Sequence, residues 1–166
     1  GTDTPEAESR PRPRETEMTD ASAPVVPSTP TADAEGLAFV ERIGLGALAD
    51  RMGIVFTEFT RERAVATMPV EGNTQPIGLV HGGAYVVLGE SLGSTHANLL
   101  APPGHVALGL DINATHTGSA TSGFVTAVCT PVHVGRSVAV HEIAISDESG
   151  RRCSTVRITN LYKRLD

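Results

Sequence analysis

The sequence predicts an α+β fold in which a curled antiparallel β-sheet wraps around one long central α-helix. Residues 84–100 contain no proline and carry apolar side chains at several positions, so they can form a long helix. Two strand-like segments precede this helix and four follow it. An early strand pair, one helix and a later run of strands is an order typical of an antiparallel sheet packed on a helix.

The first 34 residues differ in composition from the rest of the chain. Six of the eleven prolines lie there, among Glu, Arg, Ser and Thr, and Val25–Val26 is the only apolar pair. Such a segment cannot bury enough apolar surface to offset the entropy lost on ordering. We therefore expect residues 1–34 to be a disordered tail and residues 35–166 to form the folded domain.

Short helices and a strand pair are expected between the tail and the central helix. The pattern of apolar residues and of Gly breaks predicts helices at 34–43 and 48–52 and strands at 54–59 and 64–70. Pro69 falls near the end of the second strand, and proline, which cannot donate to a sheet ladder, is tolerable there on an edge. We expect residues 71–79 to form a loop.

Every segment after Pro102–Pro103–Gly104 has the pattern of a strand. The expected strands are 105–116, 123–131, 137–146 and 151–162, with a connection at 132–136 and a hairpin turn at 147–150. The first of them alternates apolar and polar residues, which predicts one inward face. That face comprises Leu108, Leu110, Ile112, Ala114 and, by the same period, His116. A single histidine on such a face is most often a hydrogen-bonded core residue.

The central helix has a stripe of small residues and one isolated carboxylate. Gly89, Gly93 and Ala97 recur at steps of four, so another backbone can approach this stripe closely. Each glycine costs roughly 1 kcal/mol of helix stability relative to Ala, so tertiary packing must hold the helix. Glu90 lies among them, and residues 64–135 contain no Lys or Arg that could pair with it locally. A solvated helix face is the ordinary explanation, but the small neighbours favour a site.

Helical geometry places the start of this helix and Glu90 apart. Nine residues separate His81 from Glu90, which corresponds to about 900° of rotation, half a turn out of line, and about 13.5 Å of rise. If both belong to one site, the simplest arrangement takes them from two different chains. Ser94 lies four residues after Glu90 and shares its face.

Composition and charge exclude several functional classes. A length of 166 residues suits one domain, and a net charge of −6 without a basic stripe argues against nucleic acid. No apolar run reaches the roughly 18 residues of a membrane span, and no signal-peptide core opens the chain. Cys129 and Cys153 are expected to be reduced and buried in a cytoplasmic protein. The six histidines match no metal-ligand spacing, so neither a metal nor a cofactor is expected.

Five ordered blocks of sequence carry a resemblance to a known family. They are residues 75–83 (QPIGLVHGG), 89–94 (GESLGS), 111–116 (DINATH), 131–136 (PVHVGR) and 150–155 (GRRCST). Together they resemble hotdog-fold acyl-CoA thioesterases of the PaaI-like branch, in particular hydroxybenzoyl-CoA thioesterases and the proofreading thioesterase of the enterobactin pathway. The resemblance covers about residues 75–160, which is most of the expected domain.

The resemblance implies how the catalytic residues divide the work. Glu90 resembles the catalytic carboxylate, acting either as nucleophile or as general base on water. Gly82 resembles the residue whose N–H polarises the thioester carbonyl, and a helix N-terminus can indeed stabilise a developing oxyanion. Gln75 and His81 resemble partners that orient the carbonyl or the water, and Ser94 resembles a helper beside the carboxylate. Simpler roles remain open, because Gln75 could bond loop backbone, His81 could cap the helix and Ser94 could bond its own helix.

The resemblance also implies a substrate-binding set. His116 resembles a histidine of the substrate pocket, and Gly83 is assigned to substrate binding with it. The arginines Arg136, Arg151 and Arg152 could meet the phosphates of CoA, or they could simply be solvated.

The family builds each site from two subunits and is usually tetrameric, so a homodimer with shared sites, assembled into a tetramer, is expected. The expected substrate is an aryl or medium-chain acyl thioester of CoA or of an acyl carrier protein. Two alternatives within the fold are an acyl-carrier-protein dehydratase and a non-catalytic acyl-CoA-binding module. A metal hydrolase is a third alternative, against which the histidine spacing argues.

Overall fold

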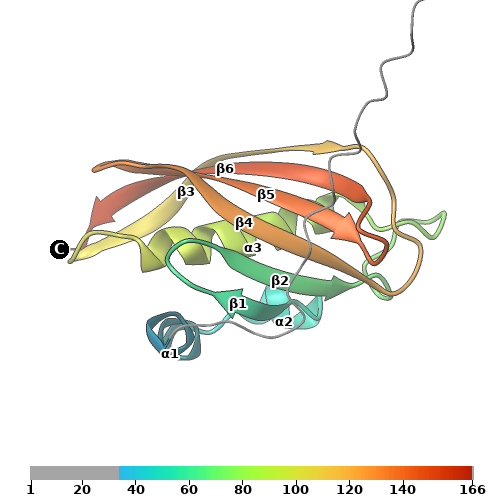
Figure 1. Cartoon of the computed structure of the whole chain (residues 1–166), viewed down its shortest axis with the longest axis horizontal. Coiled ribbons are helices and arrows are strands. Elements are labelled where there is room, and N and C mark those ends of the chain that lie inside the picture. Colours follow the sequence, from blue (N-terminus) through green and yellow to red (C-terminus); the bar gives the residue numbers. More distant parts are fainter. Residues whose placement is uncertain (1–33, 166) are drawn as a thin grey trace, which may run out of the picture.

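One antiparallel sheet encloses one long helix in the computed structural model, which describes residues 34–165. The elements in chain order are α1 (Ala34–Ile43), α2 (Ala47–Arg51), β1 (Val55–Phe59), β2 (Ala64–Pro69), α3 (Gly82–Leu99), β3 (His105–His116), β4 (Phe124–Val134), β5 (Val138–Asp147) and β6 (Arg152–Arg164). The six strands lie in the order β1-β2-β4-β5-β6-β3. Figure 1 shows the sheet curling around α3. The predicted α+β architecture is confirmed.

The tail expected at residues 1–34 lies outside the described residues, except that Ala34 begins α1.

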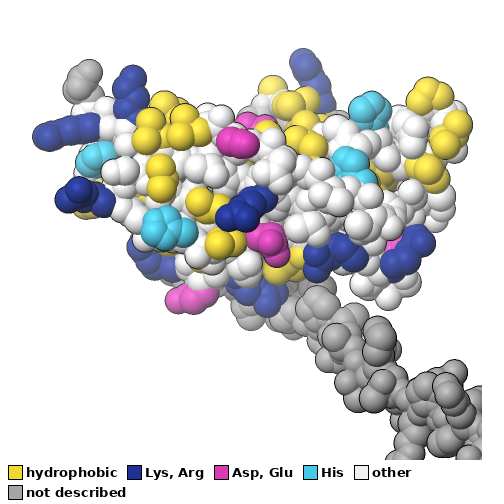
Figure 2. All heavy atoms as spheres, turned by 90° about the horizontal axis from the view of Figure 1, so that it is seen from above, with side chains coloured by type: hydrophobic (Ala, Val, Ile, Leu, Met, Phe, Trp, Pro, Cys, Tyr) yellow, Lys and Arg dark blue, Asp and Glu magenta, His cyan; other side chains and the backbone are white. Residues whose placement is uncertain are grey.

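Within residues 34–165, no helix is long and apolar enough to cross a membrane. On the face of the molecule drawn in Figure 2, Lys and Arg side chains are scattered and do not form a stripe.

Local sequence fixes the start of α3. His81 precedes the helix, and its Nδ1 accepts a hydrogen bond from the Gly83 N–H at 2.8 Å, which is a helix cap.

The stripe of small residues on α3 faces the sheet as expected. A Cβ added at Gly89 would lie 2.7 Å from Val156, and one added at Gly93 would lie 2.6 Å from Ile158. The two glycines therefore let α3 touch β6 at a separation that no larger residue permits.

The core fills the space between α3 and the inner face of the sheet. Its largest fully buried apolar side chains are Tyr85, Phe59, Met68, Leu88, Leu92, Ile143, Ile145 and Ile158. His96 and His141 are also fully buried there. Burial lowers the pKa of both imidazoles, that of His141 to about 4, so both rings are neutral near pH 7.

The fourth strand is longer than the sequence predicted. Residues 132–134, expected to be part of a connection, continue β4, and Val134 pairs with Ala139. A register shift between Pro131 and His133 allows this, because the bulge skips Val132 and pairing resumes at His133. The connection to β5 is correspondingly tight, closed by a Gly135 N–H bond to the Val138 carbonyl.

A second bulge changes which side chains of β3 face inward. The register shifts between Gly109 and Asp111, so the strict alternation predicted for this strand fails there. Ile112 and Ala114 pack against the core as expected, but Leu108 and Leu110 are 45% and 60% exposed.

Pro69 does not lie on an edge strand, because β2 runs between β1 and β4. Pro69 is the last residue of β2, and the β1 pairing ends earlier, at Val55–Thr67. Its missing N–H therefore costs the sheet no bond on the β1 side.

Candidate active site

The N-terminus of α3 presents a free backbone donor. Gly82 is the first residue of the helix, and its N–H has no hydrogen-bond partner among residues 34–165. The next N–H, that of Gly83, is taken by His81, so Gly83 does not offer its N–H to a ligand. The positive end of the helix dipole adds to the attraction of this single N–H for an oxyanion.

The loop before α3 is a closed turn that carries Gln75. The Gln75 N–H bonds to the Leu79 carbonyl at 2.8 Å, and the Gly78 N–H bonds to the Gln75 carbonyl at 2.9 Å. Gly78 has φ of 81°, a left-handed conformation that glycine adopts without strain. Thr74 and Val80 pair across the base of the turn. The Gln75 side chain makes no hydrogen bond to the described residues, so it remains available for a ligand.

His116 lies directly over the start of the helix. A Cβ added at Gly82 would lie 2.8 Å from His116 Nε2, so only glycine leaves room for the ring. His116 Nδ1 and the Ser154 hydroxyl are 2.9 Å apart, and the Tyr85 ring centroid lies 5.4 Å away. Burial raises the pKa of Tyr85 to about 12, so this phenol is neutral. His116 lies on the face of β3 that contacts the start of α3, as expected, but it is exposed and is not a core residue.

Ser154 is a site residue that sequence reasoning missed. It is fully buried and lies directly opposite His116 in the β3–β6 register. Only knowledge that β3 and β6 are neighbours, with this register, could have brought the two residues together.

Glu90 is exposed and lies in a second polar group further along α3. Its Oε1 lies 3.7 Å from the position of a Cβ on Gly109 of β3. The Ser94 hydroxyl donates to Asn160 Oδ1 at 3.3 Å, and not to a carbonyl of its own helix. Asn160 is buried, and its amide nitrogen has no partner in the described part of the chain. None of the ion pairs among residues 34–165 involves Glu90.

A single chain does not bring these two groups to one substrate carbonyl. Gly82 and Glu90 are eight residues apart in one continuous helix, which places them about 12 Å apart along its axis. The angle around the helix axis between Gly82 and Glu90 is only about 80°, less than the half turn counted from His81. The rise along the axis is therefore what mainly separates the two groups.

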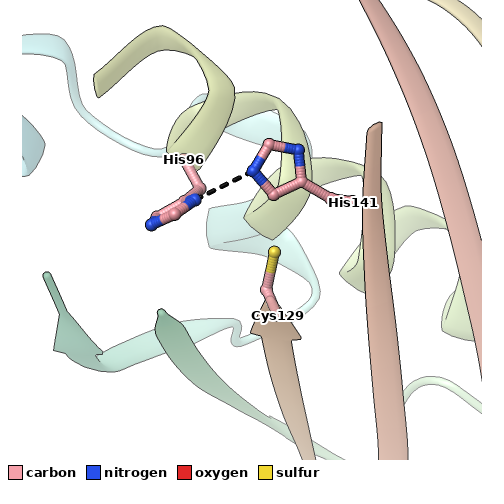
Figure 3. A group of neighbouring side chains, drawn as sticks. All are labelled: His96, Cys129 and His141. Carbon is pink, nitrogen blue, oxygen red and sulfur yellow. Dashed lines mark hydrogen bonds between the residues drawn. The ribbon is translucent and has the colours of Figure 1, made fainter. Parts of the chain in front are cut away.

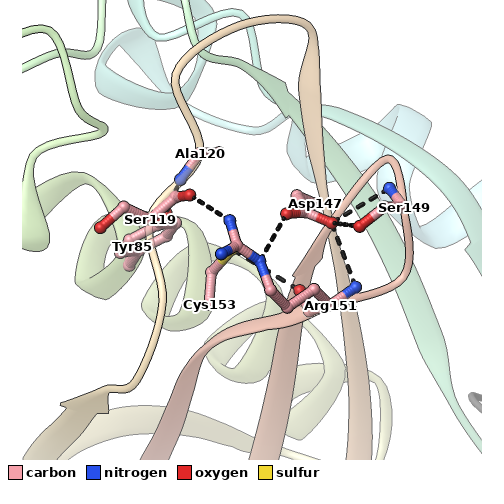
Figure 4. Close-up of polar contacts among 7 residues, drawn as sticks. All are labelled: Tyr85, Ser119, Ala120, Asp147, Ser149, Arg151 and Cys153. Carbon is pink, nitrogen blue, oxygen red and sulfur yellow. Dashed lines mark hydrogen bonds and ion pairs between the residues drawn. The ribbon is translucent and has the colours of Figure 1, made fainter.

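The three arginines assigned to CoA differ in how free they are. Arg151 bonds to the Asp147 carboxylate at 3.1 Å and to the Ser119 carbonyl at 2.7 Å, so it braces the 118–122 turn against the β5–β6 hairpin (Figure 4). Hydrogen bonds from Ser149 and then Arg151 lower the pKa of Asp147. Arg152 donates to Thr155 at 2.9 Å and is exposed. Arg136 is exposed and has no partner among the described residues.

Comparison with known proteins connects this geometry to a family. The pattern of the thioesterase superfamily matches residues 77–154. The proofreading thioesterase EntH of Cronobacter sakazakii is 42% identical over 116 residues, which cover 69% of this chain and 85% of that protein. The chain belongs to the thioesterase superfamily. This thioesterase therefore has the hotdog fold, and hydrolysis is favoured over the dehydratase and binding-module alternatives.

Solved structures agree with this assignment. A thioesterase of Pseudomonas aeruginosa, solved as a glutamine-to-alanine variant, is 37% identical with a TM-score of 0.71, covering 80% of this chain and 95% of that one. A Staphylococcus aureus thioesterase is 32% identical with a TM-score of 0.68, covering 71% and 99% of the two chains. The Escherichia coli PaaI protein is 19% identical with a TM-score of 0.70 over 80% of this chain and 94% of that one, which supports the fold alone.

Proposed function

We propose that this thioesterase hydrolyses acyl thioesters of CoA or of carrier-protein phosphopantetheine at sites shared by two chains. Glu90 comes from one chain, and Gln75, His81 and Gly82 come from the other. The observation that carries the proposal is the unpartnered Gly82 N–H at the start of α3, placed beneath His116 and beyond the reach of Glu90 in its own chain.

The chemistry needs no cofactor, because a thioester is already activated. The Gly82 N–H binds the carbonyl oxygen and stabilises the negative charge that develops on it. Glu90 either attacks the carbonyl carbon or removes a proton from the attacking water. The C–S bond breaks, the thiol leaves with a proton, and the acid is released. Gln75 and His81 orient the carbonyl or the water, and Ser94 supports the carboxylate side of the site.

The Staphylococcus aureus relative gives independent support for two of these residues. It has been solved with a glutamine replaced by alanine and, separately, with a glutamate replaced by alanine, at two positions fifteen residues apart. Gln75 and Glu90 have the same separation in this chain. The spacing supports Gln75 and Glu90 as the corresponding pair.

The edge strand β3 offers a way to join two chains. It is the outermost strand of the sheet, so one side of its backbone is unpaired, and Leu108 and Leu110 are exposed on it. A second copy of β3 would satisfy this edge and cover the two leucines. We expect a homodimer joined here, and two such dimers in a tetramer.

The same strand sets the geometry of the shared site. Gly109 lies beside Glu90, and His116 lies beside Gly82 of the same chain. In an antiparallel pair of identical strands, paired positions add to a constant, because the twofold axis exchanges them. A pair centred at Asn113 sets Ile112 opposite Ala114. With Leu110 skipped at the bulge, it sets Gly109 opposite His116 of the other chain, which brings Glu90 of one chain toward Gly82 of the other.

A hydrolysis screen tests this function. The protein is offered a panel of aryl, short, medium and long acyl-CoAs and the matching acyl-carrier proteins, and the released thiol is measured. We expect turnover of aryl or medium-chain acyl groups on at least one carrier. Binding of acyl-CoA without thiol release from any member of the panel would contradict the proposal and favour a binding module.

Ser154→Ala tests the assignment of His116 to the substrate pocket. Losing the bond to His116 Nδ1 lets the ring turn, and a bond of this kind contributes on the order of 1 kcal/mol, so we expect kcat/KM to fall about threefold to tenfold. The loss should appear in KM if His116 only binds substrate. Ser154→Thr, which keeps the hydroxyl, should restore activity, and Ser146→Ala on β5 is the control. Equal behaviour of the Ala and Thr variants would contradict the role.

A further inference from the structure

A cluster of three metal-binding side chains lies inside the core, apart from the thioester site. His96, Cys129 and His141 each offer one ligand atom, and these atoms all lie within 4.8 Å of one another. All three residues are fully buried. They come from three elements, α3, β4 and β5, and Figure 3 shows the two rings and the sulfur converging on one point.

The sheet holds two of the donors in a fixed relation. Cys129 pairs with Ile143 and His141 pairs with Pro131, so Cys129 and His141 are diagonal neighbours on adjacent strands. Both point from the sheet toward α3, where His96 occupies the last turn. Because sheet and helix are the packed core of the domain, the three donors are positioned before any ligand arrives.

A hydrogen bond outside the cluster orients the first imidazole. His96 Nε2 lies 2.7 Å from the Thr60 carbonyl oxygen, which can only accept, so Nε2 carries the proton. The lone pair of His96 Nδ1 therefore faces the cluster, 2.9 Å from His141 Nε2. A backbone carbonyl that holds the far nitrogen of a histidine is the usual outer support of a metal ligand. The ring edge of Phe59 closes the apolar side of His96, with centroids 5.7 Å apart.

The Cys129 sulfur has no hydrogen-bond partner in the described chain, unlike Cys153, which donates to the Arg151 carbonyl at 3.6 Å. Two imidazoles and one thiolate form a donor set for a borderline or soft ion. Structural zinc sites almost always have four ligands, whereas this cluster offers three donors among the described residues, all of them fully buried.

The net charge of the occupied site distinguishes the two main candidate ions, Cu⁺ and Zn²⁺. A thiolate with Cu⁺ is neutral overall, whereas a thiolate with Zn²⁺ leaves one positive charge in the dry core, which is unfavourable without a partner. Arg61 and Glu62 are the charges that act on His96, and they oppose each other. We propose that the His96–Cys129–His141 cluster binds one d¹⁰ metal ion, and that Cu⁺ fits it better than Zn²⁺. On binding, Cys129 loses its thiol proton to solvent. The His96–His141 hydrogen bond opens, and the His141 proton moves from Nε2 to Nδ1, which has no hydrogen-bond partner among the described residues.

Competition with chelators tests the site. Untagged, reduced full-length protein is titrated anaerobically with Cu⁺ against a chromophoric Cu⁺ chelator, and separately with Zn²⁺ against a zinc chelator. We expect one Cu⁺ per chain. Cys129→Ala should weaken its binding at least ~100-fold, while Cys153→Ala, at the other buried cysteine, should bind as wild type does. Circular dichroism and elution volume check that both variants fold.

X-ray absorption at the copper edge keeps the test valid if Cys129→Ala does not fold. In the wild-type protein it should detect one sulfur and two nitrogen ligands. Failure of Cu⁺ and Zn²⁺ to compete, equal Cu⁺ binding by Cys129→Ala and wild type, or a copper shell without sulfur would each overturn the site. Preference for Zn²⁺ with the same dependence on Cys129 would support the site and overturn the choice of Cu⁺.

Discussion

Glu90→Gln should leave the fold intact and lower kcat for thioester hydrolysis by at least ~10²-fold, the usual scale for losing a positioned acid or base. Glutamine matches the size of the side chain but can neither attack the carbonyl nor take a proton from water. Glu90 is exposed and makes no ion pair among residues 34–165, so the substitution should leave the melting temperature nearly unchanged. Thiol release from the best acyl thioester of the screen measures the effect.

Glu142→Gln is the matched control, because Glu142 is an exposed carboxylate on β5 and lies outside the proposed site. It should hydrolyse the same substrate at the wild-type rate. A Glu90→Gln protein that retains activity within a few-fold of wild type would show that another group activates the nucleophile.

Two inactive variants should restore activity to each other when they share a dimer. Glu90→Gln and Gln75→Ala each disable every site of a pure dimer. In a mixed dimer one site collects both lesions and the other collects neither. Random association makes about half of the dimers mixed, so roughly a quarter of wild-type activity should return after joint unfolding and refolding.

Wild type refolded in parallel corrects for losses during the procedure, and each variant refolded alone gives the background. A site contained within one chain predicts no recovery, because every site would then carry one lesion. A mixture as inactive as its parents, beside active refolded wild type, would contradict the shared site.

The fold was predictable because helix-breaking residues and hydrophobic periodicity act locally. Pro76 and Gly78 mark the loop before α3, Pro102–Pro103–Gly104 follows its end, and alternation of apolar and polar residues marks the later strands. The two bulges were not predictable. Whether the strand ends at Pro131 or continues past it through a bulge depends on how β5 pairs with β4, which the local sequence does not encode.

The candidate site was likewise predictable only in part. Gln75, His81, Gly82 and Glu90 fall within one short stretch, so a family resemblance could point to them together. Ser154 was missed because it meets His116 only through strand register.

The buried histidines were missed for a related reason. His96 and His141 are 45 positions apart and match no spacing motif, because the helix and the sheet bring them together in three dimensions.

Because β3 lies at the edge of the sheet, catalysis in the proposed dimer depends on how the β3 strands of the two chains are aligned. In the proposed dimer, the smallest slip that keeps paired side chains on the same face is two residues, which would displace the second chain by about 6.6 Å along the strand. An oxyanion donor is effective only at roughly 3 Å, so such a slip would remove Gly82 from the carbonyl that Glu90 addresses. A dimer out of register would therefore be inactive even though it is a dimer. Dilution below the dimer dissociation constant would likewise abolish turnover while each chain stays folded.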